Sequence, residues 1–273
     1  MRISVFEPHI KDAVGQSGKR YEQVLEAVRS FGVEGVEADV ASLREDAKGF
    51  RAKLDAADLA VASVYANYNF EDACDMEQVK RDVALIAESG CRKFLVIPGF
   101  IRPAQEGMRD VLLERILLGL RQTTECAVAA GLTVSLEDYD NSIAPFSTIE
   151  GLDWFFQRVE HLGFTFDTGN FLYSEQSALD AFARLGDKLV HVHCKDRSLT
   201  PITGEQPLIT TGGRALYTAP VGHGCIPMAE CVRLVKSTGY DGWISVEHFG
   251  SRDQLGYTQQ SAAWLRKAWQ DMG

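Results

Sequence analysis

Carboxylates and a histidine end four successive apolar segments in the second half of the chain. Glu137 ends SLE, Asp167 ends FTFD, His193 lies in HVHC and Glu247 ends SVE. Three carboxylates that converge on one point repel each other and are costly to desolvate, and a divalent cation removes that cost. One such carboxylate alone is more often a helix cap or a salt-bridge partner. The succession of four groups therefore predicts a metal site.

The ligand types narrow the choice of metal. The set offers carboxylate oxygens and one imidazole but no thiolate, which favours one Mn²⁺, allows Mg²⁺, Co²⁺ or Zn²⁺, and disfavours a structural zinc site. His191 and His193 have the same side-chain parity on a strand, so both can face the same side. His193 lies nearer the strand end and is the predicted ligand. His191 is expected to pack deeper or to hydrogen-bond a neighbour.

Eight short apolar, β-branched segments recur along the chain, at a spacing of roughly 34 residues that matches one βαβ step. Stretches with helical spacing of apolar residues lie between them, and the weakest is 43–57, where Gly49 interrupts it. Five glycines before strands are predicted to end helices in the left-handed conformation: 32, 90, 131, 163 and 239. The strands are expected at 3–6, 32–38, 59–66, 94–99, 132–137, 164–167, 189–194 and 243–249.

Strict alternation of strands and helices predicts a parallel sheet, and eight repeats predict closure into a (β/α)₈ TIM barrel, with residues 1–273 as a single domain. An open doubly wound sheet is the alternative, but no GxGxxG follows the first strand. The active site of such a barrel lies at the carboxyl ends of its strands. The long segment 196–226, rich in Gly, Pro and Thr, is therefore expected to cover the substrate.

Further residues near the strand ends are candidates for contacts with the substrate. Lys195 and Arg197 could hold hydroxyls or a phosphate, or could be solvated loop charges. Glu37 could bind a substrate hydroxyl or only support neighbouring side chains at the strand ends. The absence of a Walker-type glycine cradle favours a non-phosphorylated substrate. The remaining candidates are Tyr65, Asn67 and His9 as pocket lining, and Gly222 and Gly224 as a turn near the substrate.

The net charge of −10 opposes nucleic acid as a partner and weakly opposes an anionic membrane surface. No stretch approaches the roughly 18 apolar residues of a membrane span, and no signal-peptide pattern is present. Six cysteines occur without CxxC pairs, as is typical of reduced thiols. A cytoplasmic protein with no membrane partner is expected.

The motifs SLEDYDN, FDTGN, HVHCKD, GHGCIP and SVEHF resemble the sugar phosphate isomerase/epimerase family of the xylose isomerase-like TIM barrel superfamily, across essentially the whole chain. The resemblance implies that Glu137, Asp167, His193 and Glu247 are the metal ligands and that Glu137 and Glu247 also form the acid/base pair. It also implies a homodimer. Asn170, a candidate substrate contact, stands where ketose 3-epimerases often carry a histidine. The additional ligands of endonuclease IV relatives have no counterpart here.

The expected activity is that of a divalent-metal-dependent isomerase or epimerase, which moves a proton of a small sugar or polyol, of the ketose or inosose type, through an enediolate. A metal-dependent dehydratase or other lyase of a keto-polyol is one alternative. A barrel subunit that keeps the metal without catalysis is another. The two glutamates argue against the last, because a pure binding site needs no pair of bases. The sequence does not identify the sugar.

Overall fold

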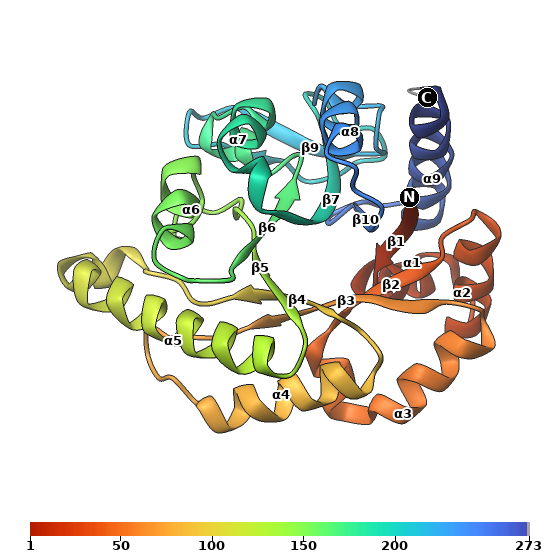
Figure 1. Ribbon diagram of the computed structural model, residues 1–273. Helices are drawn as coiled ribbons and strands as arrows, with labels where there is room; N and C mark the ends of the chain where they lie inside the picture. Colours follow the sequence, from red (N-terminus) through yellow and green to blue (C-terminus); the bar gives the residue numbers. More distant parts are fainter. Residues whose placement is uncertain (272–273) are drawn as a thin grey trace.

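Eight parallel strands close into a barrel in the computed structural model, which describes residues 1–271 (Figure 1). β10 pairs with both β1 and β7, so the predicted TIM barrel is confirmed. The strands consist largely of buried apolar residues, as expected of a sheet covered by helices on its outer face. They are β1 (Arg2–Phe6), β2 (Gly35–Asp39), β3 (Ala60–Asn67), β4 (Lys93–Ile97), β5 (Thr133–Leu136), β6 (Gly163–Asp167), β7 (Leu189–Ser198) and β10 (Trp243–Glu247).

Helices surround the barrel on its outer side (Figure 1). The spacing of apolar residues did not predict α1, which follows β1 directly with a proline in its first turn. α3 forms despite Gly49, but it is kinked at Asp46 (φ −157°, ψ 78°), whose carboxylate accepts a hydrogen bond from the Gly49 amide. The α-helices are α1 (Glu7–Ser17), α2 (Tyr21–Ser30), α3 (Val40–Ala56), α4 (Met76–Glu88), α5 (Arg109–Ala129), α6 (Ile149–Phe156), α7 (Ala178–Leu185), α8 (Met228–Ser237) and α9 (Gln254–Asp271). Short 3₁₀ helices are η1 (Pro103–Met108), η2 (Phe171–Ser174) and η3 (Gly186–Lys188). None of the helices in residues 1–271 combines the length and the apolar character that a bilayer crossing requires.

Four of the five predicted helix-terminating glycines have positive φ: Gly32, Gly90, Gly131 and Gly239. The prediction was wrong for Gly163, which is the first residue of β6. A Cβ at Gly163 would lie 2.5 Å from the Val190 side chain, so close packing of neighbouring strands requires glycine there. The left-handed residue before this strand is His161 (φ 62°).

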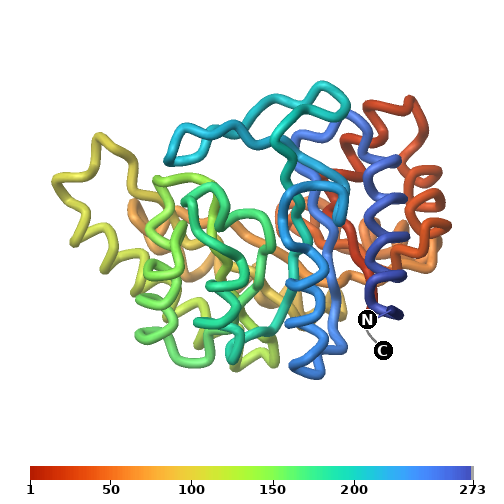
Figure 2. The backbone as a smooth tube through the Cα atoms, turned by 90° about the horizontal axis from the view of Figure 1, so that it is seen from above, coloured from red at the N-terminus to blue at the C-terminus, as the bar shows by residue number. Residues whose placement is uncertain are grey.

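The segment 196–226 extends the barrel at the carboxyl ends of its strands. β7 continues to Ser198 and pairs antiparallel with β9 (Ala215–Ala219), which pairs with β8 (Leu208–Ile209). In Figure 2 this segment, in cyan, lies along the edge of the molecule away from the N-terminus. Thr218 donates a hydrogen bond to the Phe249 carbonyl, and the Tyr257 hydroxyl donates one to Glu205. The segment is therefore fixed to the residues that follow β10 and to α9.

Candidate metal and substrate site

The four predicted ligands meet at the carboxyl ends of β5, β6, β7 and β10. The strand register places Asp167 beside His193, and Glu247 beside Lys195. His193 Nδ1 lies 2.7 Å from Glu137 Oε2 and 3.5 Å from Glu247 Oε2. Ligand atoms of Glu137, Asp167 and His193 all lie within 4.8 Å of one another, and all four side chains are buried. Glu137, Asp167 and His193 thus form a possible metal-binding site, and Glu247 lies beside His193.

The hydrogen bonding of Asp167 fits a cation. Its Oδ1 accepts hydrogen bonds from the amides of Gly169 and Asn170, each at 2.7 Å. Its Oδ2 is buried without any hydrogen-bond partner in residues 1–271, and the Lys195 ammonium is 3.8 Å away. Burial raises the pKa of Asp167 to about 6, although Lys195 opposes the shift. A buried carboxylate oxygen without a partner is costly, and a divalent cation would satisfy it.

Glu37 lies beneath this set and braces it. Its oxygens lie 3.1 and 3.2 Å from His193 Nε2 and 2.8 Å from His191 Nε2, and Ser245 Oγ donates a hydrogen bond at 2.6 Å. Burial alone would raise the pKa of Glu37, but His193 and His191 outweigh it and hold the pKa well below its usual value. An anionic acceptor at Nε2 leaves Nδ1 free to face Glu137 and a metal. Of the two roles considered for Glu37, the geometry matches support of neighbouring side chains. His191 hydrogen-bonds a neighbour, as expected.

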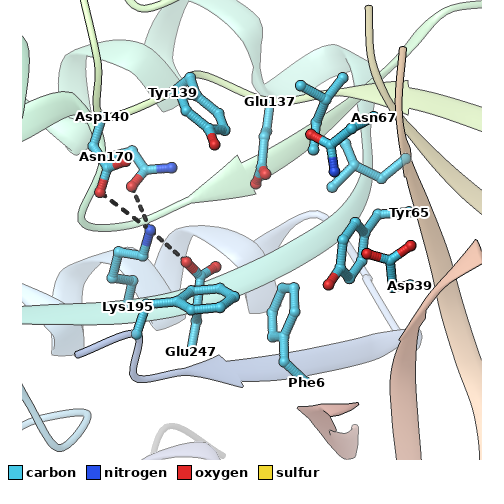
Figure 3. Close-up of a pocket in the computed structure, with 13 residues that line it drawn as sticks. Phe6, Asp39, Tyr65, Asn67, Glu137, Tyr139, Asp140, Asn170, Lys195 and Glu247 are labelled. Atoms are coloured by element: carbon cyan, nitrogen blue, oxygen red, sulfur yellow. Dashed lines mark hydrogen bonds and ion pairs between the residues drawn. The ribbon is translucent and has the colours of Figure 1, made fainter. Parts of the chain in front are cut away.

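Lys195 places a buried ammonium group among the carboxylates. Its Nζ lies 2.6 Å from Asn170 Oδ1 and 3.6 Å from Asp140, and it is in direct contact with Glu247. Burial disfavours the charged ammonium, but Asp140 and Glu247 outweigh this effect and raise the pKa of Lys195. Figure 3 shows these three contacts as dashed lines on one side of the cavity. The lysine therefore stays charged and holds Glu247 in place.

A cavity of about 300 Å³ opens above these groups (Figure 3). This volume lies at the small end of ligand pockets, which suits a ligand of monosaccharide size. Tyr65, Asn67, Asn170 and Lys195 line it, as the sequence predicted for candidate substrate contacts. The full lining is Phe6, Asp39, Tyr65, Asn67, Leu95, Ile97, Glu137, Tyr139, Asp140, Asn170, Lys195, Glu247 and Phe249.

Other candidates lie behind the cavity wall. His9 is buried with its ring 4.5 Å from that of Phe249, and its Nε2 accepts a hydrogen bond from the His248 amide. Arg197 is buried and pairs with Asp140 at 2.5 Å. These residues therefore support lining residues instead of facing the cavity. The amides of Gly222 and Gly224 each donate to Asp196 at 2.9 Å, which fixes that turn to β7.

Reasoning from sequence missed Asp39, Tyr139, Asp140 and Phe249 as lining residues. Asp39 carried the same signal as the predicted ligands, because it is the last residue of β2 and pairs in register with Tyr65. Tyr139 and Asp140 follow Glu137 in the loop after β5. A loop has no regular spacing of residues, so the sequence does not show where their side chains point. Phe249 follows β10, and the local sequence gives no sign that it reaches the cavity.

The fold and the site define the class of protein: a (β/α)₈ barrel with a possible metal-binding site and a cavity at the carboxyl ends of its strands. The chain belongs to the xylose isomerase-like TIM barrel family, whose model matches residues 25–268. This confirms the resemblance at the level of the superfamily.

Individual relatives are distant. The inosose dehydratase of Lacticaseibacillus casei is 22% identical over 256 residues, which cover 86% of this chain and 85% of that protein. A match to the inosose dehydratase of Clostridium beijerinckii reaches 31% identity but spans only 28% of that protein. A D-tagatose 3-epimerase-like protein has a TM-score of 0.74 at 19% identity, with 100% of both chains covered. A xylose isomerase-like TIM barrel protein from Mycobacterium smegmatis, solved in complex with magnesium, has a TM-score of 0.66 at 19% identity, with 92% and 89% covered. At these identities the structural likenesses show the fold alone.

Proposed function

We propose that the protein is a divalent-metal-dependent isomerase or epimerase of a small sugar or polyol. The observation that carries the proposal is that Glu137 and Glu247, two buried carboxylates, line one cavity and lie 2.7 and 3.5 Å from the same ring nitrogen, His193 Nδ1. Figure 3 shows both carboxylates directed into that cavity. Such a pair can exchange a proton with two faces of a bound substrate.

The chemistry required is removal of a proton from a carbon next to a carbonyl group. A bound divalent ion stabilises the negative charge that develops on the carbonyl oxygen. Glu137, Asp167, His193 and Glu247 would hold the ion. In an epimerisation one glutamate takes the proton, and the other, which is protonated, donates its own proton to the opposite face. Return to the neighbouring carbon gives isomerisation.

Dehydration of a keto-polyol is the second candidate function, and Lys195 favours it. Its ammonium group lines the cavity beside Glu247 and can hydrogen-bond a departing hydroxyl group. The names of the matched inosose dehydratases point in the same direction. A barrel that binds metal without catalysis is disfavoured, because both glutamates also line a cavity of about 300 Å³ that a substrate can enter.

Deuterium exchange tests the proposal. Metal-reconstituted protein is incubated in D₂O with a panel of ketoses and inososes, and NMR measures deuterium at the carbon next to the carbonyl. We expect metal-dependent exchange. Glu137→Gln and Glu247→Gln should each lower its rate by at least about 100-fold, whereas Glu160→Gln, an exposed surface change, should not. Absence of exchange with every substrate would defeat the proton-transfer mechanism, and enone absorption in the ultraviolet would identify dehydration.

Several accompanying expectations stay proposals. We propose Mn²⁺ as the physiological ion, a cytoplasmic location and a homodimer with no nucleic acid or membrane partner. The expected single domain spans residues 1–273, of which 272–273 lie outside the described residues. Atomic absorption of the purified protein and its mass in solution test the metal and the dimer.

A further inference from the structure

The cavity has a second polar end, across from Lys195. Figure 3 shows the Tyr65 hydroxyl, the Asp39 carboxylate and the Asn67 amide together on one side, while Lys195, Asn170 and Asp140 lie on the other. Glu137 and Glu247 stand between the two ends. β2 and β3 bring the group together, because the register pairs Asp39 with Tyr65 and Asn67 follows two residues later. The second end is therefore remote from Lys195 but shares the cavity with the two glutamates.

Several polar atoms at this end have no hydrogen-bond partner among residues 1–271. Tyr65 is only 8% exposed, and its hydroxyl makes no hydrogen bond with any of residues 1–271. Asp39 uses Oδ1 to cap α3 through the Ala41 amide at 2.8 Å, while its Oδ2 has no hydrogen-bond partner in the same range. The Asn67 amide is likewise free among the described residues. Tyr65 is buried, Asp39 is half-buried and Asn67 is exposed, and all three line the cavity, so their free polar atoms can exchange hydrogen bonds with the hydroxyl groups of a ligand.

The charge of the cavity selects the kind of ligand. Four lining residues carry carboxylates: Asp39, Glu137, Asp140 and Glu247. Within the described part of the chain, Lys195 is the one positively charged lining residue, and Asp140 and Glu247 already surround it. Arg197, behind the wall, is paired with Asp140. At the end remote from Lys195, a phosphate or carboxylate on the substrate would therefore face the Asp39 carboxylate with no cationic lining side chain beside it in the described part of the chain, and like charges in contact are disfavoured.

We propose that Asp39 is a specificity-determining residue that, with Tyr65 and Asn67, binds neighbouring hydroxyl groups at the end of the substrate remote from the reacting carbons and excludes phosphorylated and carboxylated sugars. The substrate class is thus an uncharged polyhydroxylated ketone. This inference rests on the proposed function, because it takes the cavity beside Glu137 and Glu247 as the place of reaction. The free carboxylate oxygen accepts from two hydroxyls, and the Tyr65 hydroxyl donates to a third oxygen. Burial and the Asp39 charge raise the pKa of Tyr65, which keeps its proton for this bond.

The variant Asp39→Asn tests the charge without disturbing the fold. Asparagine caps a helix as well as aspartate does, so α3 should still begin at the same residue. Asp75→Asn is the matched control, because Asp75 caps α4 through the Gln78 amide at 3.0 Å, is exposed and lies outside the cavity. Calorimetry on metal-loaded protein measures binding of two pairs of probes: D-fructose with D-fructose 6-phosphate, and myo-inositol with its 1-phosphate.

We expect the natural protein to bind the neutral member of at least one pair at least about tenfold more tightly than its phosphate. Loss of a hydrogen bond to a charged group costs about 1.4 kcal/mol or more, so Asp39→Asn should weaken neutral binding about tenfold. The same change should narrow the preference over the phosphate, and Asp75→Asn should change neither quantity. Equal binding of the phosphate, no binding of either neutral probe, or an unchanged affinity in Asp39→Asn would overturn the inference.

The two proposals fail in distinguishable ways, because calorimetry detects binding without turnover. Charge-selective binding that depends on Asp39, with no deuterium exchange, would sustain this inference and defeat the proposed reaction. Deuterium exchange together with equally tight binding of the phosphates would sustain the proposed reaction and defeat this inference. With a substrate found by exchange, Asp39→Asn should raise KM about tenfold and change kcat by less than about threefold, because Asp39 contacts a part of the substrate that does not react.

Discussion

Replacement of Glu37 by glutamine exchanges one carboxylate oxygen for an amide NH₂ at the centre of a buried cluster. The natural carboxylate accepts hydrogen bonds from Ser245 Oγ at 2.6 Å and from His191 Nε2 at 2.8 Å, and it faces His193 Nε2 at 3.1 and 3.2 Å. In Glu37→Gln one imidazole loses its anionic acceptor and meets an N–H donor. His193 is then free to rotate or to change its tautomer, and Nδ1 is no longer held toward Glu137.

The size of the effect follows from the bonds that change. A hydrogen bond to a charged group contributes about 1.5–3 kcal/mol, compared with about 0.5–1.5 kcal/mol for a neutral one. Replacement of one charged hydrogen bond by a neutral one costs about 1–2 kcal/mol, which corresponds to roughly 5- to 30-fold weaker binding of the metal. Changes behind histidine ligands typically weaken metal binding by about 10- to 100-fold, so the two ranges overlap above about tenfold. Glu37→Gln should therefore raise the Kd for Mn²⁺ by at least about tenfold.

Competition between the protein and a fluorescent chelator for Mn²⁺ measures this Kd at neutral pH. Glu34→Gln is the matched control, because Glu34 immediately precedes the first residue of β2 and its side chain takes no part in the cluster. Circular dichroism checks that both variants are folded. An unchanged Kd in folded Glu37→Gln would refute the bracing role of Glu37 and, with it, the assignment of His193 as a ligand through Nδ1.

Three further predictions concern stability, measured by urea unfolding. Hydrogen bonds outweigh burial and lower the pKa of Glu205 to about 2, from an ordinary value of 4.5, so its stabilising contribution is complete above about pH 4.5 and is lost as the pH falls toward 2. The free energy of unfolding of the natural protein should exceed that of Glu205→Gln by about 1–2 kcal/mol at about pH 6 and by less at about pH 3.5. A difference that stays constant with pH would contradict the lowered pKa of Glu205. Leu25 is fully buried, so Leu25→Ala should cost about 2–5 kcal/mol, whereas exposed Glu26→Ala should stay within about 0.5 kcal/mol. A Cβ at Gly35 would lie 2.8 Å from a tryptophan ring, so Gly35→Ala should destabilise by about 1–3 kcal/mol, while Gly15→Ala, in an open position on α1, should not destabilise at all.

The fold was predictable because its signals are local. Each strand shows an apolar, β-branched segment, and each βα repeat has a length that a short window of sequence reveals. The exceptions also have local causes. α1 begins one residue after β1, so no loop separates the two patterns. Gly163 was misassigned because a glycine before a strand suits a left-handed turn as well as close packing, and only the Val190 side chain decides between them.

The candidate site was predictable only in part. The ends of β6, β7 and β10 showed Asp167, His193 and Glu247, and their convergence follows from barrel closure alone. The burial of His9 behind Phe249 and the pairing of Arg197 with Asp140 depend on how neighbouring strands and loops pack. The contact of Lys195 with Glu247 depends on the β7–β10 register. None of these is encoded in the spacing of residues along one strand.

By itself, the sequence determined which chemical groups stand at the strand ends and that eight strands would close around them. Periodicity fixes the face to which each strand residue points, and this is a property of a few neighbouring residues. Only the tertiary structure decided that Glu37 braces His193 and that Asp39 faces the cavity with a free oxygen. The register between strands and the direction of each side chain set those distances, and both arise from contacts between residues that are far apart in the chain.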